Sequence, residues 1–411
     1  MLFTKPKKAI GVDIGAHSVK TVQMSRVNGR LRVEGVGYAL VDRNLVNMDP
    51  IAAHANAARE ALAGMPLSQS LLVGALPGQT VVIRYPRLPE ISRDRIGAAI
   101  EKEAGQQIPY DLSEVFLDWA LLDTVTEGNE RLMKMLLVAA KHEVIESRVQ
   151  IAGAAEIQYG MLSVDSLALA DAAEGCGLLE VGKTLALVNI GLTSASIHFV
   201  KDGISNFIRD INWGARELIQ AILRSRKCEY SHAEKLLCEI GTEKEKTPVP
   251  ETVPLDFDPE SDFTPAKPAS STASLLDPFE DEFDGTPPPA KSLTASPAGG
   301  SGADATGKDL RDLLATPLSR LVAEIRRSFD YYEHELYEMP VDRIVLSGGV
   351  AHIPLLRETL GEELGVKEVD VANPLASALV FKKDLDLSAL QERPAQFMVS
   401  IGLAARGMAD L

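Results

Sequence analysis

The sequence predicts an α/β protein with two duplicated domains, a small αβ subdomain inserted in the first domain and a long insertion in the second. Three observations support this prediction. A strand–glycine–strand pattern occurs twice, a third glycine-rich turn joins a strand to a helix, and an acidic, proline-rich segment interrupts the second half of the chain. The 411 residues suffice for two ordinary domains with sizeable cores.

The repeat consists of VDIGAHS at residues 12–18 and VNIGLTS at residues 188–194. In each copy a buried strand precedes the glycine, a second strand follows it, and a hairpin turn leads to a third strand. The turns, Asn28-Gly29 and Asp202-Gly203, are of the kind that favours tight hairpins. The strands are predicted over residues 9–14, 19–24 and 31–40 in the first copy and 185–190, 195–200 and 204–211 in the second. Two copies with matched strands indicate a duplication rather than a chance similarity between hairpins.

A small αβ subdomain is predicted to interrupt the first domain. Ser92 occupies the N-cap position of an amphipathic helix over residues 93–107, and Pro109 prevents this helix from continuing. Strands are predicted over residues 80–85, 114–122 and 131–140. A helix with an apolar stripe and three strands can bury a core of their own, so we expect a separate unit here.

The segment over residues 241–307 has an unusual composition. It contains eleven of the 23 prolines, and its 13 acidic residues face only four lysines. Such a segment cannot bury enough apolar surface to offset its ordering entropy, so we predict that it is disordered. Its two phenylalanine-bearing acidic patches, LDFDPESDF and LLDPFEDEF, are either docking motifs or incidental parts of a solvated linker.

These elements give the expected domain boundaries. Helical patterns over residues 216–240 and 310–337 flank the acidic segment, which is therefore an enlarged loop within a domain. The predicted units are a first domain (residues 1–75 and 141–180), a small subdomain (76–140), a second domain (181–240 and 308–411) and the insertion (241–307).

Composition excludes several classes of protein. The formal net charge of -16 argues against binding to a nucleic-acid backbone as the main activity. No apolar run reaches the ~18–20 residues of a membrane span, and the basic start of the chain lacks the apolar stretch of a signal peptide. The three cysteines show no metal-binding spacing and are expected to be reduced, small apolar fillers. Together these features favour a cytoplasmic protein.

The two repeated glycine turns predict a phosphate site. Backbone N–H groups point outward from such a turn, and small hydroxyl residues add donors without blocking access. Two such loops facing each other would hold a triphosphate between the domains. The candidate residues are Gly15 and Ser18 in the first loop and Gly191, Thr193 and Ser194 in the second.

Charged residues beside the first loop extend this prediction. Asp13 ends the first strand, where its carboxylate can hold Mg²⁺ through water, because Mg²⁺ keeps most of its hydration shell. Lys20 follows the loop and can direct a positive charge toward a phosphate.

The third glycine turn predicts an adenosine contact. Residues 341–346 read as a strand, Gly348 and Gly349 as the turn, and residues 353–364 as a helix. Glycines at the carboxyl end of a strand permit close backbone approach to a planar ligand such as adenosine.

Five segments of the chain carry a resemblance to a known family. They are IGVDIGAHSVKTVQM, AIEKEAGQQIPYDLSEVFLDWALL, LVAAKHEVIESRVQIAGAA, EIRRSFDYY and IGLAARG. They resemble the PilM family of type IV pilus assembly proteins, in the FtsA-like branch of the actin/hexokinase/heat-shock-chaperone ATPase superfamily. The similarity covers nearly everything except the insertion. It implies an actin-like ATPase fold in which residues 142–166 and 397–406 form the two connecting segments.

The resemblance also implies ligands and partners. It implies that the chain binds ATP and Mg²⁺, with Gly214 near the phosphates and with Glu324 and Arg327 on the adenosine side. Solvated charges on a helix are the other interpretation of Glu324 and Arg327. The implied partner is the N-terminal tail of a PilN-like membrane protein, which would hold this chain at the inner membrane, and other pilus assembly proteins are further candidates. The small subdomain mediates protein contacts in such relatives.

Two other functions remain open at this point. One is a sugar or metabolite kinase of the same superfamily, which needs an aspartate base beside the terminal phosphate. No aspartate stands in the second loop. The other is an MreB-like filament-forming protein, whose self-complementary ends a sequence does not reveal.

Two positions depart from the family pattern. Asn189 stands where relatives usually carry an aspartate, so no catalytic residue is assigned and we expect at most slow ATP hydrolysis. His17 occupies a loop position where relatives usually have a small hydroxyl residue. It either contacts a phosphate or faces solvent from the turn.

Overall fold

The structure is a computed structural model that describes residues 7–128, 130–240, 310–336 and 338–409. The insertion predicted at residues 241–307 lies outside the described residues.

Two larger sheets show the same strand order. In each sheet an antiparallel meander of three strands is followed by two parallel strands, β3-β2-β1-β4-β9 in one and β12-β11-β10-β13-β14 in the other. The first sheet comprises β1 (Lys8–Ile14), β2 (Ser18–Val27), β3 (Arg30–Leu40), β4 (Leu71–Leu76) and β9 (Met161–Val164), with β15 (Val380–Phe381) added beside β3. The second comprises β10 (Thr184–Ile190), β11 (Ala195–Lys201), β12 (Ile204–Ile211), β13 (Arg343–Gly348) and β14 (Glu368–Val371). The predicted duplication is confirmed.

Both predicted hairpin turns form at the expected positions. Asn28 and Gly29 have φ angles of 50° and 79°, and Asp202 and Gly203 have 52° and 78°. Two successive residues with positive φ match the right-handed twist of the flanking strands. The turns therefore fix the register of each meander.

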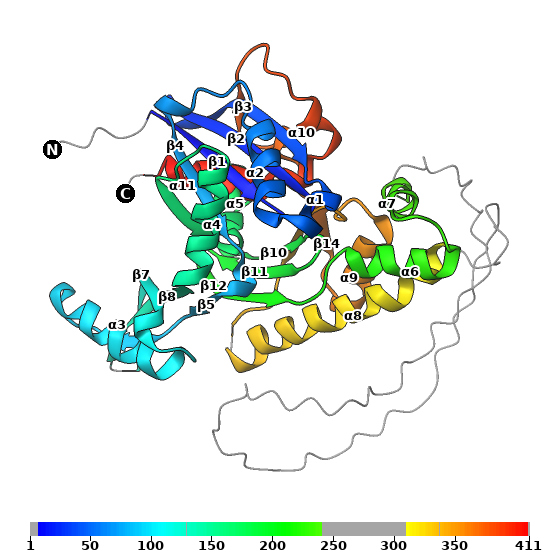
Figure 1. The fold of residues 1–411 in the computed structure, drawn as a ribbon. Coiled ribbons are helices and arrows are strands. Elements are labelled where there is room, and N and C mark those ends of the chain that lie inside the picture. Colours follow the sequence, from blue (N-terminus) through cyan, green and yellow to red (C-terminus); the bar gives the residue numbers. More distant parts are fainter. Residues whose placement is uncertain (1–6, 129, 241–309, 337, 410–411) are drawn as a thin grey trace, which may run out of the picture. The chain divides into compact units, whose positions relative to one another are not determined.

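The elements of the two halves stack in layers (Figure 1). Helices α2 (Pro50–Ala61) and α4 (His142–Ala154) cover one face of the first sheet. Helices α5 (Asp165–Gly175) and α11 (Met398–Gly407) lie between the two sheets and share one core with both. The outer face of the second sheet is covered by α6 (Arg216–Arg226), α8 (Leu310–Asp330) and α9 (Pro354–Leu364). Shorter helices are α1 (Arg43–Met48), α7 (Tyr230–Glu239) and α10 (Ser388–Glu392).

Helix α11 approaches its neighbours through glycines. A Cβ on Gly402 would lie 1.7 Å from the carbonyl oxygen of Ala168 in α5, and a Cβ on Gly11 of β1 would lie 2.0 Å from the carbonyl oxygen of Ser400. Both distances are far below contact range, so the backbones touch without intervening side chains. This tight packing places a late segment of the chain in the core of the first sheet.

A third sheet forms the small subdomain. Strand β8 (Glu130–Lys141) pairs with β5 (Val81–Arg84), β6 (Arg87–Pro89) and β7 (Val115–Glu127), and α3 (Arg93–Gln107) packs on it. The predicted helix bounds are confirmed. Ser92 is the N-cap, as predicted, with an extended backbone, although its side chain makes no capping hydrogen bond.

Other predicted elements differ in detail. The helix expected over residues 216–240 is broken at Lys227, whose φ of 49° ends α6 and separates it from α7. The strand expected at residues 341–346 begins at Arg343 and continues through Gly348. Helix α5 and strand β15 were not predicted from the sequence.

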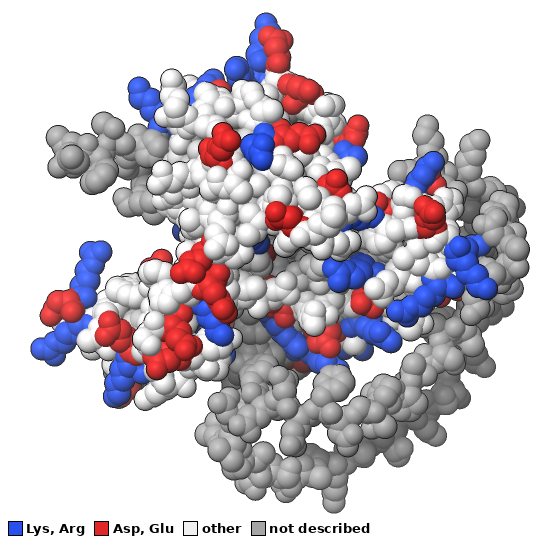
Figure 2. All heavy atoms as spheres, viewed as in Figure 1, with Lys and Arg blue, Asp and Glu red and all other residues white. Residues whose placement is uncertain are grey.

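The remaining predictions concern membrane spans, surface charge and the cysteines. Within the described ranges, no helix is both long and apolar enough to cross a bilayer. Acidic and basic side chains are interspersed over the face shown in Figure 2. Cys176 is buried as expected, whereas Cys238 is exposed, so the prediction that all three cysteines are apolar fillers is wrong for Cys238.

Candidate functional site

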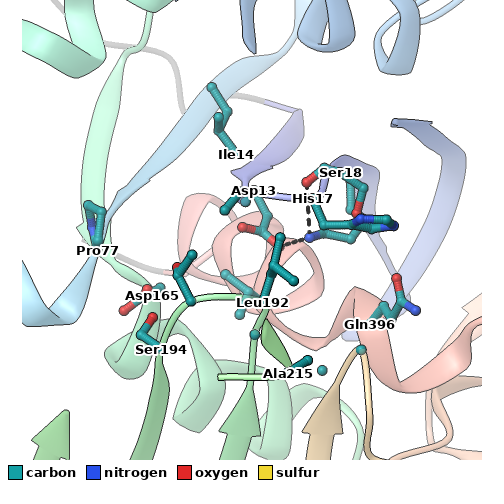
Figure 3. Close-up of a pocket in the computed structure, with 18 of the residues that line it drawn as sticks. Asp13, Ile14, His17, Ser18, Pro77, Asp165, Leu192, Ser194, Ala215 and Gln396 are labelled. Atoms are coloured by element: carbon teal, nitrogen blue, oxygen red, sulfur yellow. Dashed lines mark hydrogen bonds and ion pairs between the residues drawn. The ribbon is translucent and has the colours of Figure 1, made fainter. Parts of the chain in front are cut away.

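A cavity of about 1070 Å³ opens where the strand ends of the two sheets face each other. Figure 3 shows residues from both meanders directed into it. Nine predicted site residues line this cavity, namely Asp13, Gly15, Ser18, Lys20, Gly191, Thr193, Ser194, Gly348 and Gly349. The structure therefore brings together the three glycine turns.

The two hairpin loops have the same internal geometry. The N–H of Gly15 donates to the carbonyl of Ser18 at 3.1 Å, and the N–H of Gly191 donates to the carbonyl of Ser194 at 2.8 Å. The two residues between each pair, 16–17 and 192–193, donate their amides to no protein acceptor within the described chain. Successive backbone donors at a cavity wall are an arrangement that favours anions, and phosphate binding by these four stays a prediction.

Asp13 and Lys20 form an ion pair beside the first loop. They face each other in the register of β1 and β2, and their charged atoms are 2.9 Å apart (Figure 3). Lys20 also donates to the carbonyl of Ser18 at 3.3 Å. The lysine is thus held at the loop, and its positive charge partly neutralises the carboxylate.

Asn189 occupies the position in β10 that Asp13 occupies in β1. It lines the cavity and pairs with Ser347 of β13, whose hydroxyl donates to the Asn189 Oδ1 at 3.2 Å. The residue is therefore held by a hydrogen bond rather than by an ion pair. The site has a carboxylate at one of the two equivalent strand ends and an amide at the other.

The third turn needs glycine at one position. Gly348 has a φ of 95°, and a Cβ there would lie 2.2 Å from the carbonyl oxygen of Ile190. The next amide, that of Gly349, donates to the same carbonyl at 3.0 Å. This close contact joins the third turn to the strand that leads into the second loop.

Three predicted site residues lie outside the cavity lining. Gly214 packs behind the second loop, where a Cβ would lie 2.4 Å from the carbonyl oxygen of Leu192. Glu324, which is half-buried on α8, accepts from Arg209 of β12 at 3.0 Å and from Arg327 at 2.7 Å. Gly214 thus supports the loop, while Glu324 and Arg327 are engaged with each other and with the sheet.

Helix α7 lines the cavity on the side where α8 was expected. Five residues of α7 line it, together with His352 after the third turn. The α7 residues are Ser231, Glu234, Lys235, Leu237 and Cys238. Sequence reasoning missed them because it merged α6 and α7 into one helix. The break at Lys227 changes the direction of the chain, and no glycine or proline marks that break.

A partly buried carboxylate, Asp165, was also missed. It is the first residue of α5, lines the cavity, and accepts hydrogen bonds from the N–H groups of Gly78 at 2.9 Å and Ser166 at 2.6 Å. Burial, with a contribution from nearby Asp210, raises the pKa of Asp165 to about 7. Burial likewise raises the pKa of Asp210 to about 6. A cavity carboxylate with a pKa near neutrality is suited to accept a proton.

His17 lines the cavity at the first loop and is partly exposed, and its contact with a phosphate stays a prediction. Its Nδ1 lies 3.3 Å from the Glu234 carboxylate, which also pairs with Arg43 at 2.6 Å. The guanidinium of Arg43 lies 3.6 Å from the centre of the Tyr230 ring. Desolvation lowers the pKa of His17 despite Glu234. This cluster bridges α1 and α7 at the edge of the cavity.

A chain of hydrogen bonds joins the small subdomain to α5. The Tyr85 hydroxyl lies 2.6 Å from the Ser205 hydroxyl, which lies 2.8 Å from His198 Nε2, and His198 Nδ1 lies 2.9 Å from the carbonyl of Ser166. Burial lowers the pKa of His198 to about 4, so the ring is neutral at pH 7. The chain ends next to Asp165 and fixes the start of α5.

Comparison with known proteins identifies the family. The family model for type IV pilus assembly protein PilM matches residues 11–245 and 305–408. A solved PilM-PilN type IV pilus biogenesis complex is similar in fold, with 21% identity, a TM-score of 0.71, and 98% of this chain and 99% of that chain covered. The ethanolamine utilization protein EutJ from Carboxydothermus hydrogenoformans has 13% identity and a TM-score of 0.48, with 98% of this chain and 90% of that chain covered. The predicted actin-like ATPase fold is confirmed, and the chain belongs to the PilM family of type IV pilus assembly proteins.

Proposed function

We propose that this chain is a cytoplasmic, ATP-binding scaffold of type IV pilus assembly, held at the inner membrane by the N-terminal tail of a PilN-like membrane protein. The observation that carries the nucleotide part is the pair of equivalent loops at one cavity, with four amides that have no protein acceptor within the described chain. Phosphate groups satisfy such donors.

The residues present fit a magnesium nucleotide. Asp13 is at the end of β1 beside the phosphate loop, and no group of three metal-ligating side chains occurs among the described residues. A single carboxylate suits Mg²⁺, which binds proteins through few ligands and keeps its waters when phosphates supply the rest. Asp13 would therefore hold the ion through water, and Lys20 would contact a phosphate.

Hydrolysis of ATP at this site would be slow. Asn189 offers an oxygen acceptor without the charge and basicity of an aspartate. Asp165 is then the cavity group best suited to take a proton from an attacking water, because its raised pKa lies near 7. A scaffold that binds ATP and hydrolyses it slowly would use the nucleotide to stabilise one conformation.

Asp165 also favours a second candidate function, phosphoryl transfer to a small hydroxyl acceptor. A kinase needs such a base beside the terminal phosphate, and the second loop does not supply one. Incubation of the full chain with Mg-ATP and a panel of sugars tests this candidate. ADP release that depends on a sugar would favour the kinase, and sugar-independent release or none would favour the scaffold.

The partner part of the proposal rests on the small subdomain. The similar solved structure is named as a complex of PilM with PilN. In this chain β7 pairs with β8 alone among the described strands, so its other edge has no strand partner, although the amides of Trp119 and Thr124 donate to Asp118 and Asp123. Phe116, Trp119 and Leu121 on this strand are 56%, 38% and 48% exposed. An extended apolar tail can add to such an edge and contact both faces of the strand, since Phe116 is on one face and Trp119 and Leu121 are on the other.

A peptide-binding experiment tests the partner proposal. We expect a synthetic PilN-type N-terminal peptide to bind the full chain, and substitution of Phe116, Trp119 and Leu121 by serine to weaken binding at least tenfold, because each exposed apolar side chain loses its contact. Met48→Ser, which removes an exposed apolar side chain on α1, is the matched control. Unchanged peptide affinity in the triple variant would contradict this docking site, and ATP binding should be the same in all three proteins.

A further inference from the structure

Arg148 of α4 lines the same cavity from the first-sheet side. Within the described part of the chain its one hydrogen bond is to the carbonyl of Ile14, at the long distance of 3.5 Å. Ile14 is the last residue of β1, between Asp13 and the first phosphate loop. A guanidinium has five donors, so most of the donors of Arg148 remain available to a ligand.

Arg148 differs from the other cations of the cavity. Lys20 pairs with Asp13 at 2.9 Å, Lys235 with Glu239 at 3.7 Å, and Arg393 with Glu392 at 2.5 Å. No carboxylate of the described residues lies within 4.0 Å of Arg148. Burial lowers its pKa, although a guanidinium stays charged at neutral pH. A partly buried cation without an ion pair is favoured further when an anion joins it.

The surroundings of Arg148 indicate which anion fits. The acidic groups that act on it electrostatically are Asp13, Asp165 and Tyr159. Asp13 is the proposed Mg²⁺ residue and Asp165 is the proposed proton acceptor, and Arg148 lines the same cavity as both. A terminal phosphate that reacts between these two carboxylates would therefore lie near Arg148. The amides of both loops and Lys20 would supply donors to the phosphates nearer the nucleoside.

We propose that Arg148 binds the terminal phosphate of a nucleoside triphosphate and thereby distinguishes a triphosphate from a diphosphate. This inference rests on the proposed nucleotide function and assigns one part of that site. Guanidinium groups bind phosphates through paired hydrogen bonds, which gives both affinity and a defined direction of pull.

The position of Arg148 links this contact to the small subdomain. Helix α4 begins at His142, immediately after β8, and the His142 ring contacts the Phe116 ring edge-on with 4.4 Å between centroids. His142 Nε2 also lies 3.1 Å from the carbonyl of Ser113. Six residues of helix, about 9 Å, separate His142 from Arg148. A displacement of Arg148 toward a bound phosphate would therefore move helix α4, and through His142 it would reach the strand that carries the exposed Phe116.

Nucleotide affinities test the first part of the inference. Isothermal titration of the full chain with Mg-ADPNP and Mg-ADP is compared between wild type, Arg148→Met and Arg148→Lys, with melting temperatures to verify folding. Arg148→Met should weaken ADPNP binding about 10- to 100-fold, as expected for one lost charged contact, and ADP binding less than threefold. Arg148→Lys should fall between. The exposed Arg59→Met on α2 is the charge-matched control and should change neither affinity.

Three outcomes separate the possible errors. Equal weakening of ADPNP and ADP, or no weakening of either, would overturn the role of Arg148 while leaving nucleotide binding in place. Failure of the wild type to bind either nucleotide would overturn the proposed function itself.

Hydrogen exchange tests the link to the subdomain. ADPNP should protect amides of α4 and β8 more than ADP does, and Arg148→Met should abolish this difference. Equal protection by both nucleotides in wild type would contradict the link.

Discussion

At the scale of single residues, the two equivalent strand ends differ in charge. Asp13 pairs with Lys20, whereas Asn189 accepts a hydrogen bond from Ser347 at 3.2 Å. An amide keeps the oxygen acceptor that Ser347 needs, so the third turn stays attached to β10 without a second carboxylate. The sequence predicted this asymmetry fully, because the two loops align residue by residue. It could not predict Ser347 as the partner, because that contact depends on the register between distant strands.

The substitution Asn189→Asp tests the consequence of this asymmetry. We expect wild type to bind Mg-ATP and to turn over very slowly, and Asn189→Asp to hydrolyse it faster by up to ~10²-fold, because an aspartate adds charge and basicity near the metal. Single-turnover hydrolysis with radiolabelled ATP measures both rates. Rapid turnover by wild type would contradict the prediction. An unchanged slow rate in the variant would show that the site does not depend on this position.

At the scale of elements, Asp165 connects three of them. It begins α5, accepts from the N–H of Gly78 at the entry to the subdomain, and lies near Asp210 of β12. A Cβ on Gly78 would lie 2.4 Å from Asp210 Oδ1, so this glycine permits the two carboxylates to surround one turn. Sequence reasoning placed Asp165 at the end of a connecting segment but gave it no role, since its burial arises from packing between elements distant in the chain.

The raised pKa of Asp165 predicts a pH-dependent stability. Its folded-state value of about 7 exceeds the unfolded value near 3.9, so the native state binds more protons between these values and loses stability as pH rises through this window. Asp165→Asn should therefore increase the free energy of unfolding by about 1–3 kcal/mol at pH 8, and the gain should vanish near pH 4. Urea unfolding at both pH values measures this change. The exposed Asp118→Asn should show no such difference, and an equal effect of Asp165→Asn at both pH values would contradict the assigned pKa.

The elements themselves were largely predictable where local signals are strong. The two meanders, their hairpin turns and helix α3 follow from alternating apolar residues, Asn-Gly and Asp-Gly turns and a proline stop. The break between α6 and α7 was not, because Lys227 adopts a left-handed conformation that its sequence does not signal. This break affects the candidate site, because α7 lines the cavity and the predicted Glu324 and Arg327 of α8 do not.

At the scale of the whole molecule, the charge is unevenly distributed along the chain. Residues 241–307 carry 13 acidic residues and four lysines, which is more than half of the formal net charge of -16. The described residues end after α7 and resume at α8, and both helices pack in the same core as the second sheet. The domain boundaries drawn from the sequence stay predictions. Strand β15 pairs with β3, and α11 packs on the first sheet, although both belong to the segment that the sequence assigns to the second domain.

Replacement of residues 241–307 by a short Gly/Ser linker tests whether the body depends on them. We expect ATP affinity to be unchanged and the stability to change by no more than ~1–2 kcal/mol, since loop-closure entropy grows only logarithmically with length. Thermal unfolding with and without Mg-ATP measures this. A scrambled insertion of the same composition is the control for charge. A large loss of melting temperature in the linker variant would show that the segment packs on the body.

The packing of α11 has a consequence for the order in which the molecule assembles during translation. Strands β1 and β2 are made first, but the helix that covers their inner face, and that touches α5 through Gly402, is encoded almost 400 codons later. During translation the first sheet is therefore made before α11, and Val22 and Met24 lack this cover until α11 has been synthesised. In that interval the exposed apolar strands can be bound by chaperones. Release of residues 398–407 lets α11 dock, and docking completes both lobes at once because the same helix contributes to the core they share.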